Sequence, residues 1–118
     1  MGSPASPLLL LLPGSRDSEV KRNWPTLRDT ARRLQQERPD LRVAVGCFSD
    51  THRRRIEENL RSDQVAVDIF SGRTPELIRS ATCAIACSGS VSLELLAARL
   101  PSVIVYRLSR LNHFLAAR

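Results

Sequence analysis

Residues 84–94 read Ala-Ile-Ala-Cys-Ser-Gly-Ser-Val-Ser-Leu-Glu. A short apolar run ends in Ser-Gly-Ser, and a helical pattern starts at once, with Ser92 and Glu94 in its first turns. A strand, a tight turn and a helix N-terminus in succession direct backbone N–H groups and the helix dipole at an anion. Gly89 permits an unusual φ or a close approach of a ligand to the backbone. The same pattern also fits an ordinary turn with an N-cap.

Working outward, strand-like and helix-like segments alternate along the chain. The apolar runs predict strands at 8–12, 41–48, 65–70, 82–86 and 102–106, and the helical periodicity predicts helices at 17–38, 50–60, 74–80, 92–98 and 108–118. Asp17 or Ser18 is the expected N-cap of the first helix. Short connections between alternating elements favour a parallel sheet with right-handed crossovers. We therefore predict an α/β fold, a Rossmann-like three-layer sandwich with a five-stranded parallel sheet and helices on both faces.

Length and composition fit one soluble globular domain, because the 118 residues are 42% hydrophobic and 25% charged. We expect residues 1–7, which are small and rich in Pro and Ser, to be a flexible lead-in and residues 8–118 to be the domain. The leucine run at 8–12 is too short for a signal-peptide core or a membrane span. A cytoplasmic location is expected.

The formal net charge of +6 comes from arginine, since Lys21 is the single lysine. A basic surface favours a phosphorylated ligand, a polyanion or an anionic membrane. Arg32, Arg33 and residues 53–55 nevertheless fall in predicted helices and fit solvated helix faces. The few aromatic residues are not interleaved with the basic ones as a nucleic-acid stacking surface requires, so no nucleic acid is expected as a partner.

The cysteines and histidines form no recognisable metal site. Cys47, Cys83 and Cys87 lie in or beside strand-like runs and lack a C-x-x-C spacing, so we predict reduced core residues and no metal. His52 and His113 are interpreted as surface or cap residues.

Two loops of small residues are expected to meet at one edge of the sheet. Residues 13–16, Pro-Gly-Ser-Arg, follow the first strand, and residues 88–90, Ser-Gly-Ser, follow the fourth. Doubly wound sheets bind ligands at the carboxyl ends of their strands, where the strand order switches. With Arg16 beside them, the two loops make a diphosphate cradle. The sequence holds no P-loop, dinucleotide fingerprint or nucleophile elbow.

Several segments together resemble the carboxyl-terminal half of lipid-A-disaccharide synthase: Leu-Leu-Leu-Pro-Gly-Ser-Arg at 10–16, Glu-Val at 19–20, Ala-Cys-Ser-Gly-Ser-Val-Ser-Leu-Glu at 86–94 and Tyr-Arg at 106–107. The resemblance implies half of a GT-B fold, the twin-Rossmann architecture of many glycosyltransferases. It also implies bacterial lipid A biosynthesis, in which a diacylglucosamine passes with inversion from UDP-2,3-diacylglucosamine to 2,3-diacylglucosamine 1-phosphate. Part of the second glycine-containing pattern is shared with other nucleotide-sugar transferases.

The resemblance implies a UDP-sugar site made of Gly14, Ser15, Arg16, Ser88, Gly89, Ser90, Glu94, Tyr106 and Arg107. The two loops would hold the donor diphosphate, Glu94 would approach the uridine ribose, and Tyr106 and Arg107 would line the same cleft. From the residues alone, Glu94 also fits a helix-surface carboxylate and Tyr106 fits core packing.

The resemblance implies a UDP-sugar donor, a lipid-linked acceptor and no cofactor. It places the acceptor site and the catalytic base in an amino-terminal half that this chain lacks, and it places further pocket segments beyond residue 118. We therefore expect an incomplete nucleotide-sugar-binding domain that does not turn over alone. Peripheral contact with the inner face of the inner membrane and a homodimer both stay open. The alternatives are a non-catalytic basic α/β module that binds nucleotide, anionic lipid or RNA, and the donor domain of another UDP-sugar transferase or epimerase.

Overall fold

The computed structural model of the chain describes residues 7–60, 66–87 and 92–104, with the backbone alone at 92–94 and 104. Strands and helices alternate throughout these residues, as the sequence predicts. The elements are β1 (Leu8–Leu12), α1 (Asp17–Glu37), β2 (Arg42–Cys47), α2 (Asp50–Leu60), β3 (Asp68–Ser71), α3 (Thr74–Ser80), β4 (Cys83–Ala86), α4 (Ser92–Ala97) and β5 (Ser102–Ile104).

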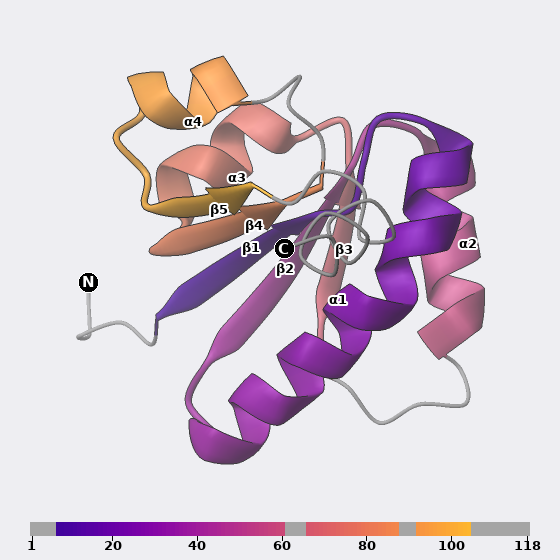
Figure 1. Cartoon of the computed structure of the whole chain (residues 1–118), viewed down its shortest axis with the longest axis horizontal. Coiled ribbons are helices and arrows are strands. Elements are labelled where there is room, and N and C mark those ends of the chain that lie inside the picture. The colour runs from indigo at the N-terminus through magenta and orange to yellow at the C-terminus, as the bar shows by residue number, and fades with distance from the viewer. Residues whose placement is uncertain (1–6, 61–65, 88–91, 105–118) are drawn as a thin grey trace, which may run out of the picture.

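The five strands form one parallel sheet in the order β3-β2-β1-β4-β5 (Figure 1). From β1 the chain first builds toward β3 on one side and then returns to add β4 and β5 on the other. The strand order therefore switches between β1 and β4, which is where ligands of such sheets bind. The predicted five-stranded parallel α/β fold is confirmed.

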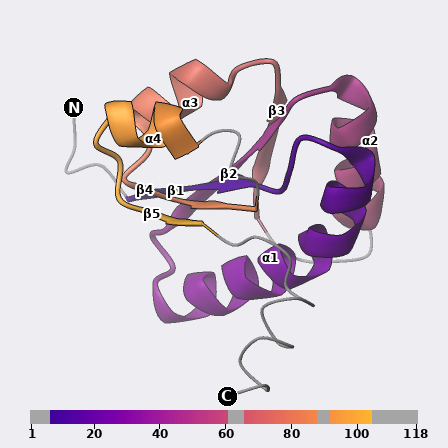
Figure 2. The ribbon, with the colours of Figure 1, turned by 45° about the horizontal axis from the view of Figure 1, so that its top comes forward.

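Helices cover both faces of the sheet, and β1 is the strand that both layers bury. Its side chains alternate, with Leu9 and Leu11 packed in the core beneath α1 and α2, and Leu8, Leu10 and Leu12 in the core beneath α3 and α4. Figure 2 shows α3 and α4 above the sheet and α1 below it. A strand buried on both faces needs an uninterrupted apolar run, and this explains the five consecutive leucines.

The apolar stripe of α1 packs on the sheet mostly as its periodicity predicts. Val20, Trp24, Leu27 and Ala31 are buried, whereas Leu34, near the end of the helix, is 36% exposed. Burying one such large side chain stabilises a fold by about 1.5–3 kcal/mol. α1 is therefore held against β1 and β2, and its N-terminus is fixed at the carboxyl edge of the sheet.

The structure corrects several predicted boundaries. The N-cap of α1 is Arg16 rather than Asp17 or Ser18, because the side chain of Glu19 reaches back to the Arg16 N–H. β2 ends before Phe48, which turns out of the sheet and is 42% exposed. β3 ends one residue later than predicted, at Ser71. The predicted helix at 108–118 and the last residues of the fifth strand, 105–106, lie outside the described residues.

None of the helices in the described ranges is long and apolar enough to cross a lipid bilayer.

Candidate functional site

The two strands that precede the predicted loops end side by side. Leu12 at the end of β1 pairs with Ala86 at the end of β4, and the Cys87 N–H donates to the Leu12 carbonyl at 2.8 Å. The chain therefore enters residues 13–16 and residues 88–90 from neighbouring positions at the carboxyl edge. Ser88, Gly89 and Ser90 themselves lie outside the described residues.

The first loop turns sharply at Gly14. Its φ is +146°, a conformation that side-chain-bearing residues rarely adopt. A Cβ added at this position would lie 2.6 Å from the Cβ of Glu19. Glycine is therefore required here both by the backbone conformation and by the close packing of α1 against the loop.

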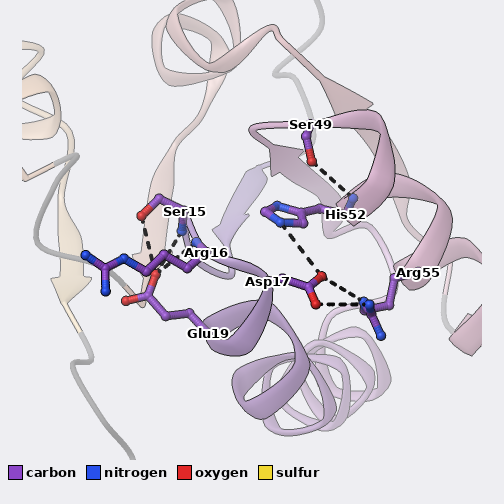
Figure 3. Close-up of polar contacts among 7 residues, drawn as sticks. All are labelled: Ser15, Arg16, Asp17, Glu19, Ser49, His52 and Arg55. Carbon is purple, nitrogen blue, oxygen red and sulfur yellow. Dashed lines mark hydrogen bonds and ion pairs between the residues drawn. The ribbon is translucent and has the colours of Figure 1, made fainter.

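The carboxylate of Glu19 closes the loop onto the start of α1. Its Oε1 accepts the Ser15 N–H at 3.0 Å, the Arg16 N–H at 3.2 Å and the Ser15 hydroxyl at 3.3 Å (Figure 3). Hydrogen bonds to an ionised carboxylate are stronger than those between neutral groups. Glu19 belongs to the family pattern, and the sequence alone assigns it no role in the site, although a Glu three residues after an N-cap is a recognised capping signal.

The edge also presents positive charge and unpaired donors. The first amides of an α-helix have no intrahelical acceptor, so the Asp17 and Ser18 N–H groups face outward with the positive end of the dipole. Arg16 is exposed and joins none of the ion pairs found among residues 7–60, 66–87 and 92–104. Backbone N–H groups at a helix start beside a free guanidinium suit a phosphate group.

A polar cluster joins α1 to α2 beside this edge. Two nitrogens of Arg55 donate to the Asp17 carboxylate, and His52 Nε2 lies 4.0 Å from Asp17 Oδ1 (Figure 3). His52 is only 7% exposed, and its Nδ1 is buried without a hydrogen-bond partner. The interpretation of His52 as a surface residue is therefore wrong, because its side chain is buried with the ring close to the Asp17 carboxylate of α1. The N–H of His52 donates to Ser49 Oγ, which caps the helix in its place.

A second contact ties α2 to the end of β3. Ser71 Oγ donates to Asp50 Oδ1 at 2.6 Å. This hydrogen bond, followed by the charge of Arg53, lowers the pKa of Asp50 below its usual value. The start of α2 and the end of β3 are therefore fixed to each other at the same edge as the Gly14 loop.

The buried cysteines are structural. The pKa of Cys47 and that of Cys87 are each raised to about 11, chiefly by burial, and the nearby Glu19 carboxylate is the second cause for Cys87. Cys47 and Cys87 are buried in the core as predicted, whereas Cys83 is half-buried. Because the charge of Glu19 acts on Cys87, the Glu19 carboxylate lies near the residue that precedes the second loop.

Of the nine residues predicted for the UDP-sugar site, the structure brings Gly14, Ser15 and Arg16 together in one turn. Glu94 lies in the first turn of α4, and its side chain is not described. Tyr106 and Arg107, like residues 88–90, lie outside the described residues. The roles of all these residues stay predictions.

Comparison with known proteins points to one family. Residues 3–118 match the family described as Lipid-A-disaccharide synthetase. The chain is 33% identical over its full length to the lipid-A-disaccharide synthase of Pseudomonas fluorescens strain Pf0-1, covering 31% of that protein. It is 35% identical over 112 residues, 95% of the chain, to the enzyme of the same name from Myxococcus xanthus, covering 29% of it. The chain thus spans about a third of the length of the curated relatives that it matches.

Proposed function

The chain belongs to the lipid-A-disaccharide synthetase family, and on this premise we propose that it is the UDP-sugar-binding part of a lipid A glycosyltransferase. Its donor is UDP-2,3-diacylglucosamine and the acceptor of the whole enzyme is 2,3-diacylglucosamine 1-phosphate. Residues 8–118 form the nucleotide-sugar-binding domain in this proposal.

The observation that carries the proposal is the turn at residues 14–16, because it combines three features of a diphosphate site. The turn lies at the switch point between β1 and β4, it opens a long helix, and it bears the exposed Arg16 guanidinium. Phosphate groups bind where helix N–H donors and arginine converge. A UDP-sugar carries its negative charge on the diphosphate, so this turn suits the part of the donor common to all such substrates.

The second loop completes the site in this proposal. β4 ends beside β1, and the family pattern assigns the hydroxyl and N–H groups of residues 88–90, which follow Cys87, to the same diphosphate. Glu94 then approaches the uridine ribose, and Tyr106 and Arg107 line the same cleft. These roles rest on the family pattern carried onto this sequence.

Acceptor binding and the catalytic base belong, in this proposal, to the rest of the enzyme. A general base must reach the acceptor hydroxyl that attacks the donor sugar. The proposal assigns that role to no residue of this chain, so the chain binds the donor without completing the transfer. Because donor and acceptor carry acyl chains, we propose that the whole enzyme acts at the inner face of the inner membrane.

Calorimetric titration of the chain with UDP, at low and moderate salt, tests the proposal. We expect saturable binding that persists as salt rises and that weakens in Ser88→Ala and Glu94→Ala. Ser80→Ala is the matched control, because its hydroxyl bonds to the Glu76 carbonyl inside α3. Absence of UDP binding together with strongly salt-dependent binding to RNA or anionic vesicles would instead support a basic binding module.

A further inference from the structure

We infer that Glu19 is the positioning residue of the phosphate-binding turn at residues 14–16. Its carboxylate fixes the Ser15 and Arg16 backbone before any ligand arrives and stays in place when the ligand binds. The inference rests on the proposed function for the identity of the ligand, and on the contacts of Glu19 for the rest.

A single carboxylate oxygen of Glu19 accepts three hydrogen bonds from the turn. Oε1 of Glu19 accepts two consecutive backbone N–H groups and the hydroxyl of Ser15, at 3.0–3.3 Å (Figure 3). An ordinary capping box accounts for the N–H of the N-cap alone, so the bond to the residue before it is additional. These contacts join residues only three or four positions apart. Forming them therefore closes a very short loop and costs little chain entropy.

Glu19 also packs closely against Gly14. The Cβ and Oε1 of Glu19 would lie 2.6 Å and 3.1 Å from a Cβ at position 14, so the side chain of Glu19 lies directly over the glycine. One turn further along α1, Asn23 Nδ2 donates to the Pro13 carbonyl at 3.4 Å, and both Pro13 and Gly14 are buried. Two side chains of α1 therefore hold the turn, and Glu19 is the one that contacts Ser15 and Arg16.

These contacts determine which donors remain for a phosphate. The Ser15 and Arg16 amides already have an acceptor, whereas the Asp17 and Ser18 amides lack one within the helix. The Arg16 guanidinium also remains. A diphosphate therefore meets the guanidinium and the next two amides, whose directions the Glu19 carboxylate sets.

The opposite arrangement is that Glu19 occupies the phosphate position and must leave. The two arrangements predict opposite effects of removing the carboxylate. If Glu19 positions the turn, Glu19→Ala weakens UDP binding, whereas if Glu19 competes with the phosphate, Glu19→Ala tightens it. Like charges repel at short range, so removing a carboxylate that competes with the phosphate would raise the affinity for UDP measurably.

The test compares four variants of the 118-residue chain by UDP titration and by amide hydrogen exchange. Glu19→Ala is expected to weaken UDP binding about tenfold or more and to speed exchange at Ser15 and Arg16. Glu19→Gln keeps an acceptor oxygen and is expected to retain both properties within about threefold. Glu19→Asp keeps the charge but is too short to reach, and should behave like Glu19→Ala. Glu37→Ala, at the far end of the same helix, is the control.

Tighter UDP binding in Glu19→Ala would overturn the inference, as would unchanged exchange at Ser15 and Arg16 in that variant. If the unsubstituted chain does not bind UDP, the proposed function fails, and the exchange measurements still decide whether Glu19 holds the turn.

Discussion

The guanidinium of Arg55 donates two hydrogen bonds, each of 3.1 Å, to the two carboxylate oxygens of Asp17. Asp17 is the first residue of α1 and lies next to Arg16, so this pair anchors the proposed phosphate-binding turn to α2. The same carboxylate faces the buried ring of His52. One acidic side chain therefore connects the turn to the second helix of the layer.

Because both partners are partly exposed, Arg55→Ala is expected to lower the free energy of unfolding by about 0.5–1 kcal/mol. Urea denaturation at low salt measures the change, which should shrink at high salt since exposed charges are screened. Arg54→Ala, an exposed neighbour on the same helix, serves as the control and should have a smaller effect. Equal losses in the two variants would show that the ion pair contributes nothing specific.

Gly14→Ala is expected to destabilise the chain by about 2–4 kcal/mol, since it combines an unfavourable φ with a clash against Glu19. Gly72 provides a matched comparison. Its φ is +69°, but an added Cβ would have no atom within 4 Å, so Gly72→Ala should cost only about 1–2 kcal/mol. Thermal unfolding measures both. A loss in Gly72→Ala as large as that in Gly14→Ala would mean that the Glu19 contact does not restrict position 14.

Stability is expected to fall as pH rises from about 9 to about 11, because the folded state raises the pKa of Cys47 and Cys87 from 9.0 to about 11. A thiol whose pKa is higher in the folded state contributes its full stabilisation at pH values below its pKa in the unfolded chain. This stabilisation is lost as pH rises through the pKa of the thiol in the folded state. The loss is on the order of 1–2 kcal/mol for each thiol. Denaturation between pH 8 and 11 measures it, and the Cys47→Ala/Cys87→Ala double variant should flatten the profile. An identical slope in that variant would assign the loss to other groups.

Ser71→Ala is expected to return the pKa of Asp50 toward its usual value, since the Ser71 hydrogen bond is the main cause of its depression. In the unsubstituted chain this group stabilises the fold above its usual pKa of 3.8, and the stabilisation is lost as pH falls through the lower folded value. Carboxyl NMR titration gives the pKa directly, with Ser80→Ala as the control. An unchanged Asp50 titration in Ser71→Ala would indicate that Arg53 dominates.

The sequence predicts the sheet well because the strongest signals are local. Five consecutive leucines fit a strand buried on both faces, and the spacing of Val20, Trp24, Leu27 and Ala31 fits the buried stripe of one helix. The turn at Gly14 is likewise indicated by its own residues. Strand ends are harder to predict, since Phe48 is a residue type common in strands but lies beyond the end of β2 and is exposed.

The contacts that shape the candidate site depend instead on how elements pack together. The burial of His52 follows from the docking of α1 against α2, which no local pattern encodes. The Glu19 contacts need the path of the chain through Gly14 as well as the capping signal. The pairing of Leu12 with Ala86, which brings the two loops to one edge, requires the strand order of the sheet.

The central claim is that a diphosphate binds where β1 turns into α1. Amide NMR of the chain titrated with UDP, and with uridine as the control, tests it most directly. We expect phosphate-dependent shifts at residues 14–18 and at the second loop, 88–90, with little change at the opposite edge around Gln35 and Leu41. Saturable UDP binding that leaves residues 14–18 unshifted, or that shifts the Gln35 edge instead, would contradict the account.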